Sequence, residues 1–455
     1  MKRVWSVAET RAAESGLPEG VLIDRASTAV ARRAVSMMGG AYGRRVLVVA
    51  GPGHNGADAL WAGLKLQQRG AHVDVALPLG EPRDEHGREP LRRLVAGRVR
   101  PPYDLYLDGL LGVGARPGPV PWPYNGPTLA VDVPTGVDAD TGAVSPEAVR
   151  ADVTVTFGGL KTGLVVGAGA TYAGLVEVAT IGLSDVGGAT FLVEAVDVGG
   201  YVVGPAEETD KYRRGVVGVY AGSAPYPGAA VLACRGAQRA GCGYVRLVAP
   251  RAVAEAVRAA YPEVVAVEPG GDLPHADAWV VGPGLGDAAD EAVAHVLASG
   301  VPVVVDADAL RPNDFKRHVA TVLTPHTGEF ERLTGIARDD ADRDRLGVTR
   351  AAAANLGATV LLKGRTTVVA DPGGTAYVNP TGTPWLGTAG TGDVLSGVVA
   401  ALLTRHPDGA RAAACAAWLH GLAGRIAAGE PGVAVTALDV AEVLPAAARI
   451  ALASC

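Results

Sequence analysis

The segment from Gly387 to Asp393 combines residue types that suit phosphate chemistry. Three glycines and two threonines lead to a carboxylate, and the apolar stretch from Val394 to Leu402 follows at helical spacing. The first N–H groups of a helix lack intrahelical partners and carry its positive dipole end, so a glycine-rich approach to a helix makes an anion site. A carboxylate there can take a proton from a hydroxyl group that attacks the bound phosphate. A plain helix cap would explain Asp393 but not Gly390 and Gly392, which a cap does not need. We therefore predict a phosphoryl-handling site with Asp393 as its catalytic base.

Four further polar or glycine-rich segments follow predicted strands of the second half. They are residues 282–286, 306–308, 324–329 and 363–364. Because open α/β folds bind ligands at the carboxyl ends of their strands, we expect these segments to converge on Asp393. Asp306 and Asp308 suit either a cation or a helix cap. His326 stands near a proline and a glycine, where ligand contact is favoured, and the Lys363 ammonium can meet a nucleotide phosphate or lie in solvent.

A polar glycine-rich loop, residues 51–58, follows the predicted strand Arg45–Ala50 in the first half. Its glycines match the Gly-x-Gly-x-x-Gly fingerprint, with Asp74 further along, so a Rossmann dehydrogenase is one interpretation. Against it, Asp74 lies inside its strand rather than at the strand's end. The second interpretation is that Asn55 gives an oxygen ligand to a hard monovalent cation. Three more loops in order favour the second interpretation: residues 108–114, 132–142 and 157–162.

The elements that must position these residues are short apolar strands that alternate with helices. The strands are nearly continuously apolar, as expected for parallel sheets buried on both faces, and the pattern predicts doubly wound α/β domains. In the first half the predicted strands are Arg45–Ala50, His72–Leu77, Tyr103–Leu107, Leu129–Val133, Val153–Phe157 and Val176–Ile181. In the second half they are Val216–Ala221, Tyr244–Ala249, Val264–Val267, Ala278–Val281, Pro302–Val305, Thr321–Leu323, Thr359–Leu362, Thr367–Ala370 and Ala376–Val378. The longest helices are predicted at Ala229–Ala240 and Ala410–Ala428.

The segment between the two halves carries mixed signals. Val193 to Val203 reads as extended, and the polar turn Gly204–Glu208 follows it. We place the domain boundary near residue 205, which predicts domains of residues 1–205 and 206–455.

Composition limits the classes of function. The net charge is −6 and basic residues do not cluster, so we expect no nucleic-acid partner. The four cysteines, at 234, 242, 415 and 455, lack metal-ligand spacing, and we expect reduced, buried thiols. The sequence shows neither a signal-peptide pattern nor an apolar run of 18 residues, so we expect a cytoplasmic protein without a membrane partner. We also expect a homo-oligomer.

Residues 206 to 450 resemble a known family. Seven motifs occur in its order: Lys211–Gly215, Pro227–Ala230, Gly282–Gly286, Asp306–Leu310, Thr324–Glu329, Lys363-Gly364 and Gly387–Gly397. Together they are similar to the ADP- or ATP-dependent NAD(P)H-hydrate dehydratases, which are relatives of ribokinase-like kinases. The resemblance implies that the hydrate contacts Ala229, Gly284, His326 and Asp393. It implies that the adenine nucleotide contacts Lys363, Gly364, Arg365, Thr366, Thr367 and Gly392, with Mg²⁺ as a cofactor. Trp385-Leu386 departs from the family's usual small-Met-Ala pattern.

The loops of residues 1 to 200 resemble a second family, the NAD(P)H-hydrate epimerase domain. The resemblance implies a potassium ion bound by Asn55, Asp108 and Thr135, and Asp132 as the acid/base group. It implies that the hydrate contacts Asn55, Gly56, Ala57, Asp58, Ala59, Gly112, Val113, Gly114, Ala115, Arg116, Pro117, Gly118, Asp132 and Lys161. The family usually shows Asn-Asn-Gly-Gly-Asp-Gly where this chain has His54 to Ala59.

Together these features predict a Rossmann-like doubly wound sheet followed by a ribokinase-like α/β domain. The resemblance implies an enzyme that interconverts the R and S epimers of NAD(P)H hydrate and dehydrates the S epimer while consuming ADP or ATP. The alternative is a ribokinase-like small-molecule kinase, for a vitamin or sugar, with a degenerate dinucleotide-binding or scaffolding first half. A kinase would leave a stable phosphorylated substrate, whereas a dehydratase would leave free phosphate and reduced cofactor.

Overall fold

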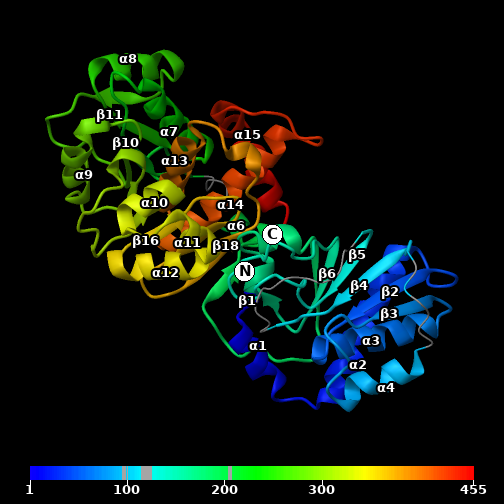
Figure 1. The fold of residues 1–455 in the computed structure, drawn as a ribbon. Helices are drawn as coiled ribbons and strands as arrows, with labels where there is room; N and C mark the ends of the chain where they lie inside the picture. The colour runs from blue at the N-terminus through cyan, green and yellow to red at the C-terminus, as the bar shows by residue number, and fades with distance from the viewer. Residues whose placement is uncertain (95–98, 100, 114–124, 203–207) are drawn as a thin grey trace. The chain divides into compact units, whose positions relative to one another are not determined.

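The computed structural model describes residues 1–94, 99, 101–113, 125–202 and 208–455 (Figure 1). The chain forms two compact units, one of residues 3–188 and one of residues 189–455 with residues 1–2. The predicted joint at residue 205 lies outside the described residues. The contacts divide the chain earlier, at Gly188, because strand β9 (Thr190–Leu192) already pairs with β18 (Ala376–Asn379) of the second unit.

The first unit contains a six-stranded sheet in the order β3-β2-β4-β5-β6-β8. Every pair of neighbours is parallel. The strands are β2 (Arg45–Ala50), β3 (His72–Ala76), β4 (Leu105–Gly109), β5 (Thr128–Val131), β6 (Val153–Phe157) and β8 (Leu175–Ala179). The strand order reverses between β2 and β4, and such a reversal opens a ligand crevice at the carboxyl ends of the two strands. Asn55 follows β2 in the first turn of the next helix, and Asp108 lies near the carboxyl end of β4.

Helices cover this sheet and bring side chains to its carboxyl edge. They are α1 (Val7–Glu14), α2 (Glu19–Met38), α3 (His54–Gln67), α4 (Glu85–Arg93) and the short α5 (Gly169–Tyr172). Buried alanines on α2 and α3, such as Ala34 and Ala62, allow the two helices to pack closely. The short strand β1 (Lys2–Trp5) pairs with β7 (Leu160–Lys161), which fixes the backbone of Lys161 before the 3₁₀ turn Thr162–Leu164.

In the second unit the strands follow the order β12-β11-β10-β13-β14-β15-β16-β17-β18-β9. Pairing is parallel except at β16–β17 and β17–β18. The strand order reverses between β10 and β13, which opens a second crevice. The strands not yet given are β10 (Val216–Tyr220), β11 (Tyr244–Val248), β12 (Val265–Val267), β13 (Ala278–Val281), β14 (Val303–Val305), β15 (Thr321–Leu323), β16 (Thr359–Leu362) and β17 (Thr367–Ala370).

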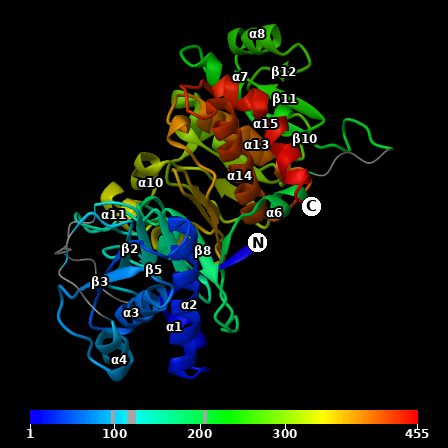
Figure 2. The ribbon, with the colours of Figure 1, turned by 90° about the vertical axis from the view of Figure 1, so that its right-hand side faces the viewer.

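Alanine-rich helices pack together on one face of this second sheet (Figure 2). They are α7 (Pro227–Arg239), α13 (Thr391–Leu403), α14 (Gly409–Ala428) and α15 (Ala437–Leu452). Glycine makes the approach of α7 to α13 possible, because a Cβ on Gly236 or Gly397 would lie 2.1 Å from a backbone oxygen of the facing helix. The remaining helices are α6 (Ala195–Gly199), α8 (Arg251–Ala260), α9 (Ala289–Leu297), α10 (Thr327–Thr334), α11 (Arg338–Arg343) and α12 (Arg345–Leu356), with 3₁₀ turns at Gly286–Ala288, Ala307–Ala309 and Pro384–Leu386.

The fold confirms the predicted α/β class, and three local predictions need correction. The segment expected to be extended from Val193 contains helix α6, because Glu194 and Asp197 form a capping box that starts a helix there. Helix α13 begins at Thr391, so Asp393 is its third residue rather than the residue before it. Cys234, Cys242 and Cys415 are buried free thiols as expected, but Cys455 is exposed. None of the described helices is long and apolar enough to cross a bilayer.

Candidate active sites

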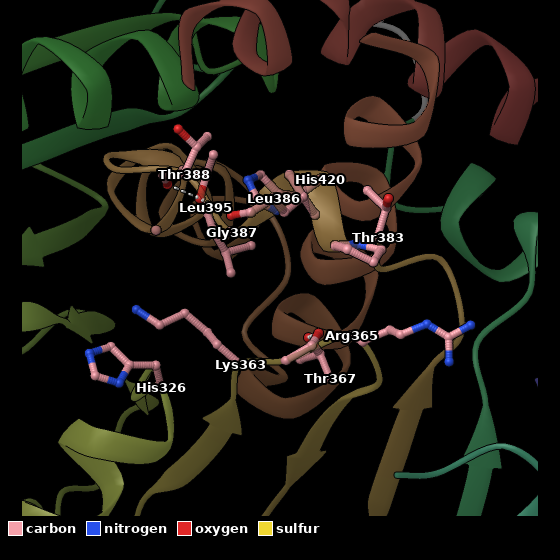
Figure 3. A pocket seen from close by; sticks show the side chains of 14 residues that line it. His326, Lys363, Arg365, Thr367, Thr383, Leu386, Gly387, Thr388, Leu395 and His420 are labelled. Atoms are coloured by element: carbon pink, nitrogen blue, oxygen red, sulfur yellow. Dashed lines mark hydrogen bonds between the residues drawn. The ribbon is translucent and has the colours of Figure 1, made fainter. Parts of the chain in front are cut away.

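A cavity of about 450 Å³ opens at the carboxyl edge of the second sheet. Two rows of side chains border it (Figure 3): His326, Lys363, Arg365 and Thr367 lie on one side, and Thr383, Leu386, Thr388 and His420 lie on the other. The first row comes from the ends of strands. The second comes from the 3₁₀ turn Pro384–Leu386 with its cap Thr383, from the glycine-rich segment and from α14. The remaining lining residues are Gly364, Pro384, Gly387, Thr391, Gly392 and Leu395.

Lys363 is fixed at the floor of this cavity by a carboxylate network. Its Nζ lies 2.8 Å from Oδ1 of the fully buried Asp306 and 3.6 Å from Oε2 of Glu329. Ser396 Oγ donates to the other Asp306 oxygen at 2.6 Å. Burial alone would lower the pKa of Lys363, but the Asp306 and Glu329 carboxylates outweigh burial and raise that pKa, so the ammonium stays charged.

The Lys363 ammonium also lies against the start of α13. A Cβ on Gly392 would stand 3.2 Å from Lys363 Nζ, and Gly390, which caps the helix, has a φ of +88°. The free N–H groups of the first helical turn and a charged lysine therefore face the same space. This arrangement suits an anion such as a phosphate group.

Asp393 lies in the first turn of α13, beside this anion position. Burial, followed by the charge of Asp306, raises the pKa of Asp393 to about 7, although Lys363 acts in the opposite direction. The described residues include no ion pair to Asp393, because Lys363 is committed to Asp306. A carboxyl group with a pKa near neutrality can exchange a proton with a substrate hydroxyl at physiological pH.

His326 combines a structural and a site position. Its Nδ1 accepts hydrogen bonds from the Gly328 and Glu329 N–H groups at 2.9 and 3.4 Å, and it thereby caps α10. Burial lowers the pKa of His326, so the ring is neutral and Nε2 carries the proton. The ring still borders the cavity, where that N–H can donate to a ligand.

The predicted residues Ala229 and Gly284 lie next to each other but do not line this cavity. Gly284 has a φ of +64°, and a Cβ there would stand 2.8 Å from the Ala229 Cβ. They follow β10 and β13, the two strands between which the strand order reverses, so they mark the crevice beside the cavity. Thr366, a predicted nucleotide contact, is buried and also lies outside the lining.

His420 and Leu386 line the cavity although the motifs of the sequence assign them no part in it. His420 is buried on α14, lines the cavity, and has a pKa lowered to about 4, chiefly by burial. Its Nε2 has no hydrogen-bond partner among the described residues. Leu386 packs on Gly424 of α14 and lines the same cavity, while the neighbouring Trp385 packs on Gly432 and is partly exposed. The glycines at these contacts are a signal in the sequence, but their partners are set only by the packing of α14.

In the first unit, Asp132 and Lys161 form a buried pair at the carboxyl edge of the sheet. Lys161 Nζ donates to Asp132 Oδ1 at 2.7 Å and to the Phe157 carbonyl at 2.6 Å. The Thr156 hydroxyl and the Phe157 N–H also donate to Asp132 Oδ1, and none of these bonds uses Oδ2. Asp132 has a φ of +65°, an uncommon backbone conformation for a residue other than glycine, and such positions are frequent in active sites.

Asn55, Asp108 and Thr135 meet in one hydrogen-bonded cluster. The buried Asp108 carboxylate accepts from the Thr135 N–H at 2.7 Å and from the Thr135 hydroxyl at 2.6 Å. The side-chain amide N–H of Asn55 donates to the Leu111 carbonyl, which leaves the Asn55 amide oxygen for another partner. The Leu111 N–H donates to Thr135 Oγ1. The cluster is rich in oxygen and holds a buried negative charge, so its donor set fits a hard cation.

Asp58 and Glu14 line a further cavity of about 340 Å³ in this unit. Burial raises the pKa of Asp58 well above its ordinary value, and the charges of Asp132, Glu14 and Glu19 add to the effect. Burial and Asp132 also raise the pKa of Glu14. Asp58 Oδ1 has no hydrogen-bond partner among the described residues. The site thus holds an ion-paired carboxylate, Asp132, and a carboxyl group that favours its protonated form, Asp58.

The other predicted contacts of the first unit divide into three groups. Ala57 and Ala59 are buried, with Ala59 directed at Gly109, so their added methyl groups point into the packed interior rather than into the loop. Gly112 lies against the Asn55 side chain, next to Val113. Gly114 to Gly118 lie outside the described residues. Asp74, on which the dehydrogenase interpretation depended, accepts a hydrogen bond from the Tyr103 hydroxyl inside the sheet region.

Two models of known protein families match this chain. Residues 217–446 match the model described as NAD(P)H-hydrate dehydratase, and residues 19–163 match the model described as YjeF-related protein N-terminus. The bifunctional NAD(P)H-hydrate repair enzyme Nnr of Mycobacterium leprae is 42% identical to this chain over 95% of both chains. The protein of the same name from Pyrobaculum aerophilum is 37% identical over 97% of this chain and 96% of its own.

The chain belongs to the family of bifunctional NAD(P)H-hydrate repair enzymes.

Solved structures agree with this assignment for the second unit. The ADP/ATP-dependent NAD(P)H-hydrate dehydratase of Bacillus subtilis, co-crystallised with ATP and Mg²⁺, is 31% identical and covers 57% of this chain and 98% of its own, with a TM-score of 0.55. A ribokinase-like superfamily protein of Enterococcus faecalis shares the fold at 23% identity, with a TM-score of 0.52. The resemblance inferred from the motifs is therefore confirmed, and the repair family is favoured over the small-molecule kinases.

Proposed function

We propose that the second unit dehydrates the S epimer of hydrated NADH or NADPH at the expense of ADP or ATP, and that the first unit interconverts the R and S epimers. The observation that carries the dehydratase half is the placement of Asp393 beside Lys363 at the start of α13. A base with a pKa near 7, a charged lysine and free helix N–H groups are the parts needed to move a phosphoryl group to a hydroxyl.

The proposed chemistry has two steps. Asp393 accepts the proton of the hydrate's hydroxyl group while the hydroxyl oxygen attacks the terminal phosphorus of the nucleotide, and the bond from that phosphorus to the leaving oxygen breaks. The phosphate ester then loses phosphate from the ring carbon while the adjacent ring carbon loses a proton, which restores the double bond of NAD(P)H. Hydroxide is a poor leaving group and phosphate a good one, so the nucleotide makes the elimination possible.

The cavity supports a division of labour among its residues. Lys363, Gly364, Arg365 and Thr367 border one side of it, and we assign the nucleotide's phosphates to the space between them and Gly392. Thr366 stays assigned through its backbone, because its side chain is buried. The hydrate is assigned to the neighbouring crevice with Asp393, His326, Ala229 and Gly284. Carboxylates surround this position, and Mg²⁺, a hard cation, would enter with the phosphates, whose charge it would neutralise.

For the first unit, we assign Asp132 and Asp58 to proton transfer and Asn55, Asp108 and Thr135 to a potassium ion. Epimerisation requires the hydroxyl group to leave the ring carbon as water and water to return on the other face. A protonated Asp58 can supply the first proton and an ion-paired Asp132 can receive the second, both at the edge where the strand order reverses. Bound at the oxygen-rich cluster, potassium would supply a fixed positive charge. Gly56, in the first turn of α3, and Gly112 and Val113, after β4, would contact the hydrate.

The test uses purified full-length protein with the separated epimers of hydrated NADH. With ADP or ATP, Mg²⁺ and K⁺, the S epimer should regain NADH absorbance at 340 nm and release phosphate. The R epimer should regain it faster than its spontaneous epimerisation allows. A stable phosphorylated product without NADH would contradict the dehydratase assignment, and parity with the spontaneous rate would contradict the epimerase assignment.

We also propose that the protein acts in the cytoplasm as a homo-oligomer. The three buried free thiols are compatible with a reducing compartment. Size-exclusion chromatography with light scattering tests the oligomeric state, and a monomer at micromolar concentration would contradict it.

A further inference from the structure

A second cavity of the second unit has an unusual lining. Its volume is about 190 Å³, and none of its lining residues borders the larger cavity. Arg214 and Gly241 precede β10 and β11, so this cavity lies at the amino ends of the strands, whereas the loops beside Asp393 lie at the carboxyl ends. Its described lining residues include four arginines and no carboxylate; they are Val202, Arg214, Arg239, Ala240, Gly241, Arg405, Leu419, Leu444, Pro445, Ala448, Arg449 and Leu452.

Arg405 is the least compensated of the four. It follows the end of α13, its Nε is buried, and that nitrogen has no hydrogen-bond partner in the described part of the chain. Burial lowers the pKa of Arg405, and the nearby charge of Arg214 lowers it further. Cys242 is the remaining titratable group that acts on Arg405, but burial raises the pKa of this thiol to about 12, so it carries no charge at neutral pH. The positive charge of Arg405 also acts on His406: burial and Arg405 both lower the pKa of His406.

The other arginines add charge that local groups offset only in part. Arg239 pairs with Glu442, but Glu442 is shared with Arg235. Arg214 donates to the Gly241 carbonyl at 3.3 Å, and Arg449 lies in the last turn of α15. Helices α7, α13 and α15 all end at this cavity, and each carbonyl end carries about half a negative charge. Among the described residues, the four arginines face three such helix ends and one carboxylate, which leaves about one to two positive charges uncompensated in a chain whose net charge is −6.

Like charges gathered around a partly buried space without a counter-ion are unfavourable unless an anion joins them. Guanidinium groups form paired, directional hydrogen bonds to phosphate oxygens, and the aliphatic lining excludes water and strengthens these bonds. A cavity of about 190 Å³ is smaller than the roughly 300–1,000 Å³ of whole small-molecule sites, so a nucleotide can insert only its phosphate end.

We propose that this arginine cavity is a second anion site that binds a phosphate group: inorganic phosphate, diphosphate or the terminal phosphate of a nucleotide. It is separate from the proposed active site and does not depend on the proposed function. The competing explanation is that each arginine only stabilises the carbonyl end of its own helix.

The test titrates full-length protein separately with phosphate, diphosphate and ATP by isothermal calorimetry, at constant ionic strength set with KCl. For at least one of these ligands, the parent should show one more binding site per chain than Arg214→Gln or Arg405→Gln. Both variants should keep the binding site at Lys363 and Gly392, because the substitutions leave those residues in place. The ligand for which the variants lose one binding site, or at least tenfold in affinity, identifies the natural source of the phosphate. Arg317→Gln is the matched control, since Arg317 is a partly buried arginine of the same unit that bonds the Val301 carbonyl outside the cavity.

Thermal unfolding separates the two explanations even where a variant changes stability. Under the proposal, Arg405→Gln should melt at the same temperature as the parent or higher without anions, because repulsion is relieved, and should lose the rise that the anion gives the parent. If Arg405→Gln and Arg214→Gln melt lower without anions and bind every anion with the parent's stoichiometry and affinity, the arginines serve their helix ends alone and the proposal is overturned.

Discussion

The two units use the same residue types at the same edge of a parallel sheet, yet they pair their charges differently. In the first unit the buried Lys161 binds the proposed catalytic carboxylate itself, with 2.7 Å between its Nζ and Asp132 Oδ1. In the second unit Lys363 binds a supporting carboxylate, Asp306, at 2.8 Å, and Asp393 keeps a pKa of about 7. The lysine therefore pairs with the proposed catalytic carboxylate itself in the first unit and with a neighbouring carboxylate in the second.

This difference matches the two kinds of proton transfer that are proposed. A phosphoryl acceptor needs one base that picks up a proton near neutral pH, and Asp393 has that property without an ion-pair partner among the described residues. Exchange of a hydroxyl group between two faces needs a donor and an acceptor together. The first unit provides Asp58, whose pKa burial raises well above its ordinary value, and the ion-paired Asp132 for these roles.

Removing the carboxylate of Asp393 should have the largest effect. Asp393→Asn keeps the size of the side chain but cannot accept the hydroxyl proton, so dehydration should fall by about 10³-fold or more. The absorbance of NADH formed from the S hydrate with ADP or ATP measures it. Epimerisation by the same variant should equal that of the parent, and an equal loss of both activities would mean that the two units do not act separately.

Breaking the ion pair of the first unit should have the next largest effect. Lys161→Met fills the buried space but leaves Asp132 without its charged partner, so epimerisation should slow by about 100-fold. Interconversion of the epimers, followed by chromatography, measures the rate. The dehydratase rate on the pure S epimer is the internal control. Retention of the parent's epimerisation rate would show that the pair is only structural.

The pH dependence of dehydration should sharpen the contrast between the units. Because Asp393 must be ionised to act, kcat/KM should rise about tenfold per pH unit below pH 7 and level off above it. Measurements between pH 5.5 and pH 8.5 with the S epimer test this. A profile that is flat across pH 7 would contradict Asp393 as the base.

A methyl group at the start of α13 should weaken nucleotide binding. Gly392→Ala places a Cβ 3.2 Å from Lys363 Nζ, in the space assigned to phosphate, so the KM for ADP or ATP should rise about fivefold to tenfold with a smaller change in kcat. Gly271→Ala is the matched control, because a Cβ there meets nothing within 4 Å. An unchanged KM would move the phosphate position away from Gly392.

The smallest expected effect is on stability. The folded-state pKa of Asp393 lies above its unfolded value of 3.8, so the folded state binds more protons between pH 3.8 and about 7, and stability falls as the pH rises through this window. Asp393→Asn removes the buried charge and should stabilise the second unit by about 4 kcal/mol at pH 8 but not at pH 4. Urea unfolding at both pH values measures it, and destabilisation at pH 8 would contradict the raised pKa.

The strand ends and loops could be predicted from the sequence because they depend on local chemistry. Strands such as Val153–Phe157, Ala278–Val281 and Thr359–Leu362 have the predicted bounds, since a short run of apolar and β-branched residues with a glycine one or two positions after it marks a buried strand and its end. The helix at Ala195–Gly199 was misread because a capping box formed by Glu194 and Asp197 outweighed the β-branched residues around it.

Pairing across the fold could not be predicted in the same way. Lys363 was expected to face a phosphate, but nothing in its neighbourhood along the chain names Asp306 or Ser396 as its partners. His420 stands among alanines and glycines of α14, and its place on the cavity wall depends on how that helix packs. The four arginines of the second cavity come from separate segments of the chain and carry no shared motif.

The glycine-rich approach to α13, the carboxylate at Asp393 and the order of the motifs were determined by the sequence alone, because backbone conformation and reactive groups belong to single short segments. Only the tertiary structure decided three other features: the pKa of Asp393, the ion pair between Lys363 and Asp306, and the grouping of the uncompensated arginines. Burial and charge pairing depend on distances between residues that are remote along the chain, and those distances exist only once the sheet and its helices have packed.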